Sequence, residues 1–338
     1  MARPVICIGT SHGPQLITEP RDWPARVIAD KRNRHFHRGT EYDFDGLVAL
    51  RAKDRDWAPQ IAFEMWQRRH GLCQEAIGAL ADRFRAARPD VAVIFGNDQS
   101  EIFTDANIPA FAVYSGETIA NIPKSTEQRA DLPPGVAEAE LGYCPPVKAV
   151  YPCQPELARH LITSLIADEF DVAQMNSLPT GPRGHNGVPH AFGFVYRKIM
   201  RDDVIPHVPL IVNNYYEPNK PTVKRCAAFG RAVARALRSA PGESRVALIA
   251  SGGLTHFAID EELDRTVLDA FAAGDLERVE RIPEAMFRSP GTGEIKNWIP
   301  LAAAALELGM KMTLIDYVPC YRSEAGTGTA MAFAYWAA

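Results

Sequence analysis

The sequence predicts an α/β fold with a mostly parallel central sheet that helices cover on both faces. Two observations lead to this prediction. Short runs rich in β-branched residues recur along the chain, and segments with the helical spacing of apolar residues separate several of them. Such alternation is typical of parallel sheets covered on both sides. Because ligands of these sheets bind beyond the carboxyl ends of the strands, we expect the active site there.

The elements follow in order along the chain. The predicted strands are 4–9, 91–96, 110–114, 172–175, 209–212, 246–250 and 312–315. The predicted helices are 58–88, 155–168, 222–238 and 298–308. We expect one catalytic domain over residues 1–338, with a helical insert at about 18–88 and a long loop excursion, rich in proline and charge, at about 120–152.

Composition excludes several classes of function. The chain has 338 residues, 46% of them apolar, and a formal net charge of −4 without a basic block, so nucleic acid is not an expected partner. We expect a cytoplasmic protein, because the sequence has neither a signal peptide nor an apolar run of roughly 18 residues that could span a membrane. The six cysteines include no C-x-x-C pair and are expected to be reduced thiols.

Polar side chains cluster where the predicted strands end. His12 follows the first strand, and the segment 97–101, with Gln99 and Glu101, follows the second. Segments 213–216 and 251–256 follow two later strands and contain Asn213, Tyr215, Tyr216 and His256. Two glycine-rich and proline-rich segments add His185, His190 and Glu294. These side chains are expected to converge on one rim of the sheet.

The order of these motifs resembles the protocatechuate 4,5-dioxygenase β-subunit family, the class III (type II) extradiol ring-cleavage dioxygenases. The similarity rests on Gly-Thr-Ser-His ending at His12, Asn-Asp after the second strand, Gly-Gly-Leu-Thr-His ending at His256, and Glu-Ile-Lys-Asn-Trp starting at Glu294. The resemblance implies a ferrous ion held by two histidines and one glutamate. His12 matches the first histidine and Glu294 the glutamate, whereas Gln99 stands where the second histidine is expected.

Three interpretations of Gln99 remain open. It could ligate iron through its amide oxygen. Alternatively, if the strand continues, Glu101 would point to the same face two residues later and replace it. In the third interpretation the metal is lost or different, and the protein is a non-oxygenase homologue that hydrolyses, isomerises or binds a related aromatic compound. His35 and His37 are a more remote source of a ligand.

The resemblance also implies two catalytic histidines that do not bind iron. His256 matches the acid or base beside substrate and oxygen, and either His190 or His185 matches the other, with His190 preferred. Histidine suits proton transfer because its pKa lies near neutrality. Tyr215, Tyr216 and Asn213 are expected to bind the substrate.

The implied reaction is ring cleavage of a catecholic acid by O2, with protocatechuate, gallate or a methylgallate as examples. Arg183, Arg197 and Lys296 are candidate partners for the acidic group of the substrate. In two-subunit relatives a small separate subunit covers the active site, and here the insert could do so in cis. We therefore expect a homo-oligomer without a separate small subunit.

Overall fold

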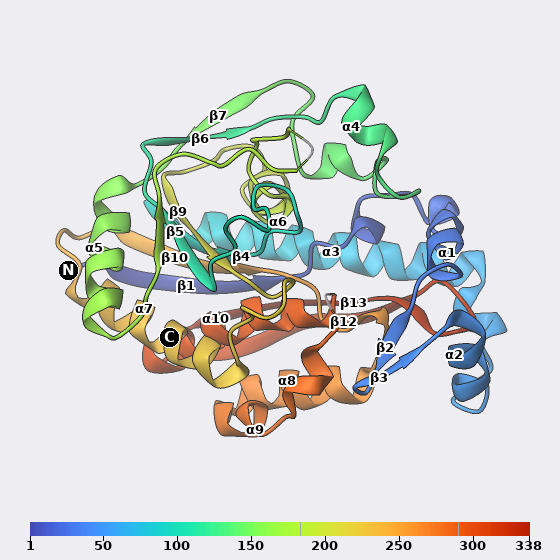
Figure 1. The fold of residues 1–338 in the computed structure, drawn as a ribbon. Coiled ribbons are helices and arrows are strands. Elements are labelled where there is room, and N and C mark those ends of the chain that lie inside the picture. Colours follow the sequence, from blue (N-terminus) through green and yellow to red (C-terminus); the bar gives the residue numbers. More distant parts are fainter. Residues whose placement is uncertain (183, 290) are drawn as a thin grey trace.

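The computed structural model describes residues 1–182, 184–289 and 291–338, and its centre is a nine-stranded sheet (Figure 1). The strand order is β11-β13-β1-β10-β4-β9-β5-β8, with β12 beside β13. The four strands β1, β10, β4 and β9 run parallel, whereas β13 and β5 join them antiparallel on either side. The strands of this sheet are β1 (Arg3–Thr10), β4 (Val91–Gly96), β5 (Phe111–Tyr114), β8 (Ala173–Met175), β9 (His207–Val212), β10 (Arg245–Ser251), β11 (His256–Ala258), β12 (Lys311–Tyr321) and β13 (Thr327–Ala337).

The central strands are apolar on both faces because a core lies on each side of the sheet. In β4, Val93 and Phe95 belong to one core cluster, and Ala92 and Ile94 to the other. This alternation follows from the two-residue period of a strand. Helices supply the rest of each core, so the predicted double cover of the sheet is confirmed.

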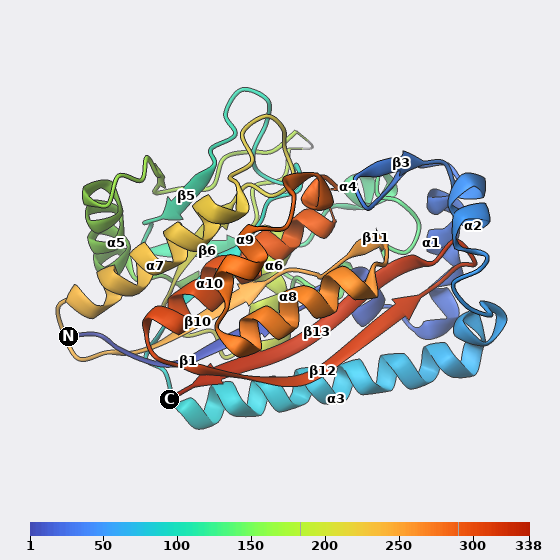
Figure 2. The ribbon, with the colours of Figure 1, turned by 90° about the horizontal axis from the view of Figure 1, so that it is seen from below.

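The long helices lie in two layers. One layer contains α5 (Pro155–Ala167), α7 (Val223–Ser239), α8 (Glu261–Ala273), α9 (Leu276–Glu280) and α10 (Ile295–Glu307). The other contains α3 (Phe63–Ala87) and α6 (His190–Phe194), which continues as a π-helical turn over Val195–Ile199. Figure 2 shows α7, α8 and α10 in front of the strands, with α3 along β12.

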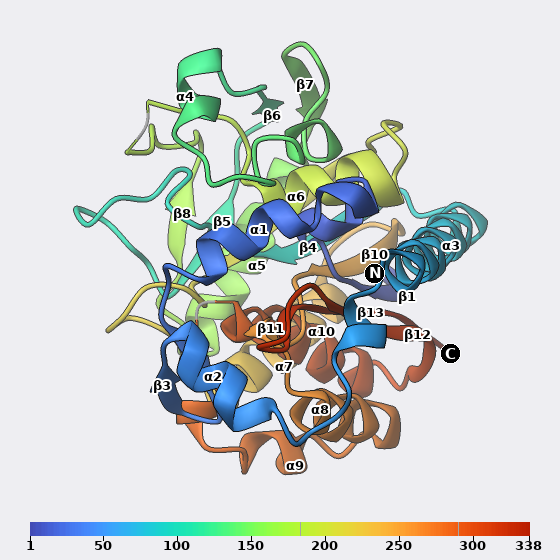
Figure 3. The same cartoon turned by 90° about the vertical axis from the view of Figure 1, so that its right-hand side faces the viewer.

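Shorter elements lie outside these layers. They are helices α1 (Pro24–Asp30), α2 (Phe44–Arg51) and α4 (Thr126–Ala130), the hairpin of β2 (His35–His37) and β3 (Thr40–Tyr42), and the pair β6 (Thr118–Asn121) and β7 (Ala149–Pro152). Single 3-10 turns are Pro14–Leu16, Pro20–Asp22, Ala58–Ile61, Glu140–Gly142, Glu284–Phe287 and Thr292–Glu294. Seen from the end at which β1 finishes, α1 lies across the front of the sheet (Figure 3).

The predicted fold class is confirmed, and each of the seven predicted strands is present. The sequence pattern does not predict β13, which lies between β1 and β12. Its sequence alternates alanine with larger residues, and alanine is not a strand former, so burial between two strands decides its conformation. The single-domain boundary and the status of 18–88 as an insert stay predictions. None of the helices in the described part of the chain combines the length and apolar character needed to cross a membrane.

Candidate metal centre

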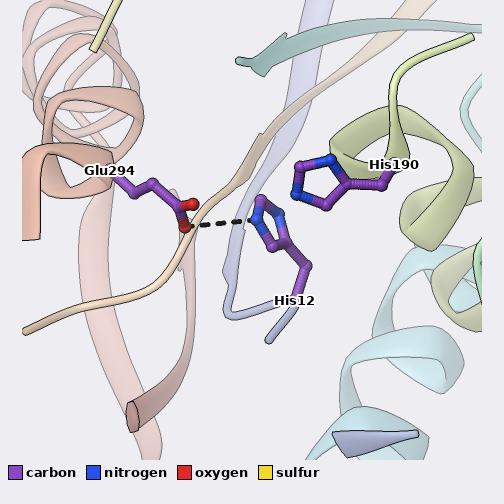
Figure 4. A group of neighbouring side chains, drawn as sticks. All are labelled: His12, His190 and Glu294. Carbon is purple, nitrogen blue, oxygen red and sulfur yellow. Dashed lines mark ion pairs between the residues drawn. The ribbon is translucent and has the colours of Figure 1, made fainter. Parts of the chain in front are cut away.

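A cavity of about 350 Å³ opens at the carboxyl ends of β1, β4 and β10. The loops that leave these strands bring His12, Gln99 and His256 to its wall, and the start of α10 brings Glu294. The cavity thus lies at the edge of the sheet where the sequence predicts the site. Figure 4 shows three side chains of this wall, His12, His190 and Glu294, which point toward one another from separate segments.

His12 is held between β10 and Glu294. Its Nδ1 lies 2.9 Å from the hydroxyl oxygen of Ser251, and its Nε2 lies 3.1 Å from Oε2 of Glu294. The second contact lacks hydrogen-bond geometry, so Nε2 is buried without a hydrogen-bond partner among the described residues. Burial lowers the pKa of His12, although Glu294 opposes the shift. A neutral imidazole is the form that binds metals.

Glu294 is a buried carboxylate that accepts hydrogen bonds from two groups. Its Oε2 accepts a hydrogen bond of 2.6 Å from the backbone N–H of Gly253, and its Oε1 accepts one of 2.6 Å from the amide of Gln99. Burial acts to raise the pKa of Glu294, but His12 and His256 outweigh it and hold the pKa well below its usual value. Glu294 is therefore ionised, as a metal ligand must be.

His190 begins α6 and forms an ion pair with Glu101. Oε1 of Glu101 accepts a hydrogen bond of 3.0 Å from the backbone N–H of His190, and Oε2 lies 2.7 Å from Nδ1. Burial opposes the charge on both groups, yet their attraction raises the pKa of His190 and lowers that of Glu101 to about 2. Because Nδ1 contacts Glu101, Nε2 is the ring nitrogen that remains available to bind a metal.

The donor set of this cluster suits a divalent transition metal. One ligand atom from each of His12, His190 and Glu294 lies within 4.8 Å of the others. Two imidazoles and one carboxylate are the donors of the facial triad that non-haem iron enzymes use. The buried, unpartnered Nε2 of His12 is the state expected of an atom whose lone pair serves a metal.

The segment after β4 is a loop and does not continue the strand. β4 ends at Gly96, and the Asp98 carboxylate accepts hydrogen bonds from the backbone N–H groups of Glu101, Ile102 and Phe103. This turn directs Glu101 to His190, so the premise that Gln99 and Glu101 share a strand face was wrong. Burial, reinforced by Glu101, raises the pKa of Asp98 to about 7.

His256 lies beside the cluster with its Nδ1 held by a backbone carbonyl group. Its Nδ1 lies 2.8 Å from the carbonyl oxygen of Leu254, which can only accept, so Nδ1 carries the hydrogen. Nε2 lies 3.7 Å from Oε1 of Glu294 and is an acceptor in the neutral form of the ring. A Cβ at Gly253 or Gly291 would come within 2.7 Å or 2.4 Å of the imidazole, so both glycines are needed for this ring position.

Residues 58–322 match the family described as the catalytic LigB subunit of aromatic ring-opening dioxygenase. The chain belongs to this family. A relative, gallate dioxygenase of Pseudomonas putida strain KT2440, is 34% identical over 103 residues. That match covers 30% of this chain and 28% of the relative. Within the predicted insert, α3 belongs to the region that matches the LigB family, whereas residues 18–57 precede it.

Of the other predicted site residues of this LigB-family chain, some line the cavity and others do not. Tyr215 lines the cavity. Among the described lining residues, neither Tyr216, Asn213 nor His185 appears. The hydroxyl groups of Tyr216 and Ser100 form a hydrogen bond, and Asn213 bonds backbone groups of its own loop, including the carbonyl oxygen of Tyr216 at 2.9 Å. These contacts give Asn213 and Tyr216 a role in the loop, while His185 is buried beside Gly187.

The remaining candidates lie elsewhere. Lys296 is buried against the Pro221 carbonyl oxygen and Glu284, and Arg197 pairs with Asp202. Arg183 lies outside the described residues. His35 and His37 belong to the β2–β3 hairpin and do not line the cavity within the described part of the chain.

Sequence reasoning missed the polar network that joins the LigB-family motifs. Asn297 donates 2.8 Å hydrogen bonds to Oδ1 of Asn97 and to the carbonyl oxygen of Ser251, and it accepts one of 3.0 Å from Asn214. It thereby ties the exits of β4, β10 and β9 to the first turn of α10. The asparagines that directly follow strands could have indicated this network from the sequence, but Asn297, which contacts both of them, lies far away in the chain.

Sequence reasoning also missed the contribution of the excursion at 120–152. Tyr143 donates a 2.8 Å hydrogen bond to the backbone oxygen of His12, and its ring meets His190 edge-on, with 5.5 Å between the ring centroids. Lys124, Val136 and Glu140 of the same excursion line the cavity. The excursion therefore forms part of the site wall.

Proposed function

We propose that this protein is a non-haem Fe(II)-dependent extradiol dioxygenase that opens the ring of a catecholic aromatic acid with O2. The observation that carries the proposal is the meeting of His12, His190 and Glu294 in one cavity, in a chain of the LigB family. The cavity volume of about 350 Å³ suits a single-ring substrate.

We assign the metal to His12, His190 and Glu294. Glu101 then acts on the metal through His190, because a carboxylate on Nδ1 orients the imidazole and strengthens Nε2 as a donor. Gln99, the ligand favoured by sequence reasoning, presents its amide nitrogen to Glu294. An amide nitrogen does not ligate metals, so Gln99 would have to turn its amide to offer the oxygen.

A ferrous ion held here would supply the Lewis acidity that favours ionised catechol hydroxyls and the redox chemistry that O2 activation requires. The protein supplies the proton acceptor. With hydrogen on Nδ1, His256 can take a substrate hydroxyl proton on Nε2 and return it later in the reaction. With His12 and His190 as ligands, His256 is the one imidazole among the described cavity residues left for proton transfer.

The test compares metal content and oxygen uptake. Anaerobically prepared protein is expected to hold about one iron per chain, and His190→Ala is expected to lose most of it, because a ligand's removal greatly weakens binding. Gln99→Ala is expected to retain the iron. The matched control is His185→Ala, a histidine of the same segment that should leave iron content unchanged. Oxygen uptake is then followed with protocatechuate, gallate, 3-O-methylgallate and catechol.

Two results would contradict these assignments. Iron retained by His190→Ala and lost by Gln99→Ala would return the ligand role to Gln99. A wild-type protein that neither binds iron nor consumes O2 with any of the four compounds would refute the dioxygenase proposal. It would favour the non-oxygenase homologue, for which the direct contact between Gln99 and Glu294 is the supporting observation.

A further inference from the structure

Three cationic side chains line the cavity, and two of them form ion pairs with carboxylates at 4.0 Å or less. Arg322 donates bidentate hydrogen bonds of 2.7 Å to the carboxylate of Asp30 and a third bond to Gln15. The ammonium group of Lys124 lies 4.0 Å from Glu101. Arg26 donates only to the backbone oxygen of Pro134, at 3.3 Å, and forms no ion pair with a carboxylate among the described residues.

Arg26 lies on a helix that a buried ion pair anchors to the rest of the fold. It belongs to α1, which lies across the carboxyl ends of the parallel strands (Figure 3). The buried Asp30–Arg322 pair ties the end of α1 to the segment after β12. A rigid support of this kind reduces the entropy lost when a ligand binds.

The loop of Pro134 and Gly135 is shaped around the Arg26 side chain. Gly135 has a φ of +79°, and a Cβ at this position would lie 2.8 Å from Cδ of Arg26. The neighbouring carboxylate, Glu138, accepts a 2.7 Å hydrogen bond from the backbone N–H of Gly135. The loop therefore makes room for the stem of Arg26, and Glu138 attracts the guanidinium group without forming an ion pair with it among the described residues.

The guanidinium group keeps its charge at neutral pH. Burial, assisted by repulsion from Arg322, lowers the pKa of Arg26 to about 10, which is still well above neutrality. A partly buried guanidinium with free donors favours a planar, bidentate anion such as a carboxylate. The cavity therefore offers a cation for an anionic group in addition to the His12–His190–Glu294 cluster.

We propose that Arg26 binds the acidic group of the substrate and thereby sets the preference for aromatic acids over neutral catechols. The inference rests on the proposed function for the identity of the substrate as a catechol. Arg26 precedes residues 58–322, so this specificity residue comes from outside the region that matches the LigB family. Arg183, Arg197 and Lys296 are not needed for this role.

The test is anaerobic calorimetric binding of 3,4-dihydroxybenzoate and of its neutral amide, with metal content measured on each sample. Wild type is expected to bind the acid about tenfold to hundredfold more tightly than the amide, as a charge-assisted hydrogen bond implies. Arg26→Gln should lose this preference while its affinity for the amide and its metal content stay unchanged. Arg26→Lys should retain part of the preference, because it keeps the charge.

The matched control is Arg21→Gln, which removes an exposed arginine just before α1 and should behave as wild type. Full preference for the acid in a folded Arg26→Gln protein would overturn the inference, as would a wild type that binds acid and amide equally. Because the test needs no O2, its failure is distinguishable from failure of the proposed reaction, which oxygen uptake measures separately.

Discussion

At the residue scale, the pairing of Glu101 with His190 distinguishes this site from a simple loss of one ligand. The carboxylate that sequence reasoning considered as a replacement ligand instead contacts both the backbone and the imidazole of His190. The ion pair with Glu101 favours the protonated imidazole of His190 and so raises the pKa of His190. Metal binding at Nε2 must displace that proton, so metal affinity is expected to rise with pH.

The ion pair predicts a pH-dependent stability of the metal-free protein. The folded pKa of His190 is raised above 6.5, so its contribution is complete below pH 6.5 and is lost as pH rises through the raised value. The pKa of Glu101 is lowered from 4.5 to about 2, so its contribution is present above pH 4.5 and is lost on acidification toward pH 2. Both contributions are therefore present between pH 4.5 and 6.5.

Thermal unfolding of metal-free wild type and Glu101→Gln checks this prediction. The difference in Tm is expected to be largest between pH 4.5 and 6.5 and to narrow at higher pH. Glu127→Gln, which changes a fully exposed glutamate, is the control and should follow wild type throughout. A Tm difference that is constant from pH 5 to pH 9 would show that the ion pair does not set the stability.

At the element scale, α1 depends on one buried ion pair for its position over the site. Asp30 accepts two 2.7 Å hydrogen bonds from Arg322 and one of 2.6 Å from Thr327, and all three side chains are buried. This arrangement joins the segment before the LigB-family match to the turn between β12 and β13. The position of Arg26 therefore depends on the sheet as well as on its own helix.

Asp30→Ala is expected to lower the free energy of unfolding by about 3–5 kcal/mol, because it leaves Arg322 buried without its carboxylate partner. Urea denaturation at neutral pH measures the change. Glu41→Ala is a contrasting variant that breaks the exposed pair between Arg34 and Glu41, and its cost should stay below about 1 kcal/mol. Equal effects of the two variants would argue against Asp30 as the anchor of α1.

At the scale of the whole molecule, the proposed metal centre joins distant parts of the chain. His12 follows β1, His190 starts α6 and Glu294 precedes α10, so the three side chains meet only in the folded protein. A metal that binds the folded state and not the unfolded chain stabilises the folded state by mass action. The gain is about 4 kcal/mol when the free metal concentration is a thousand times Kd.

Adding Fe(II) to the metal-free protein under anaerobic conditions is therefore expected to raise Tm by several degrees in a concentration-dependent way. Differential scanning fluorimetry measures the shift. Glu294→Gln, which keeps the size of the side chain but removes its charge, should lose most of it. An equal shift in this variant would place the stabilising metal at another site.

Local sequence pattern determined much of the secondary structure of this protein and the edge of the sheet at which the site lies. Apolar runs of period two, separated by helical patterns, specify buried strands and their covering helices, and the polar residues after the strands mark the edge of the sheet. His12, Glu294 and His256 were singled out at such positions and received their expected roles from the family resemblance, and the structure brings all three to one cavity. β13 could not be identified from the pattern, since its alanines adopt a strand only through burial between β1 and β12.

Tertiary structure alone decided the partners of the polar side chains. Glu101 meets His190 because β4 ends at Gly96 and the turn that Asp98 stabilises directs it there, and α6 approaches that turn from almost ninety positions away in the chain. Arg26 reaches the cavity only because α1 packs across the strand ends. Sequence pattern reports the period of an element and the chemistry of its residues, whereas distances between remote segments arise from the packing of the whole chain.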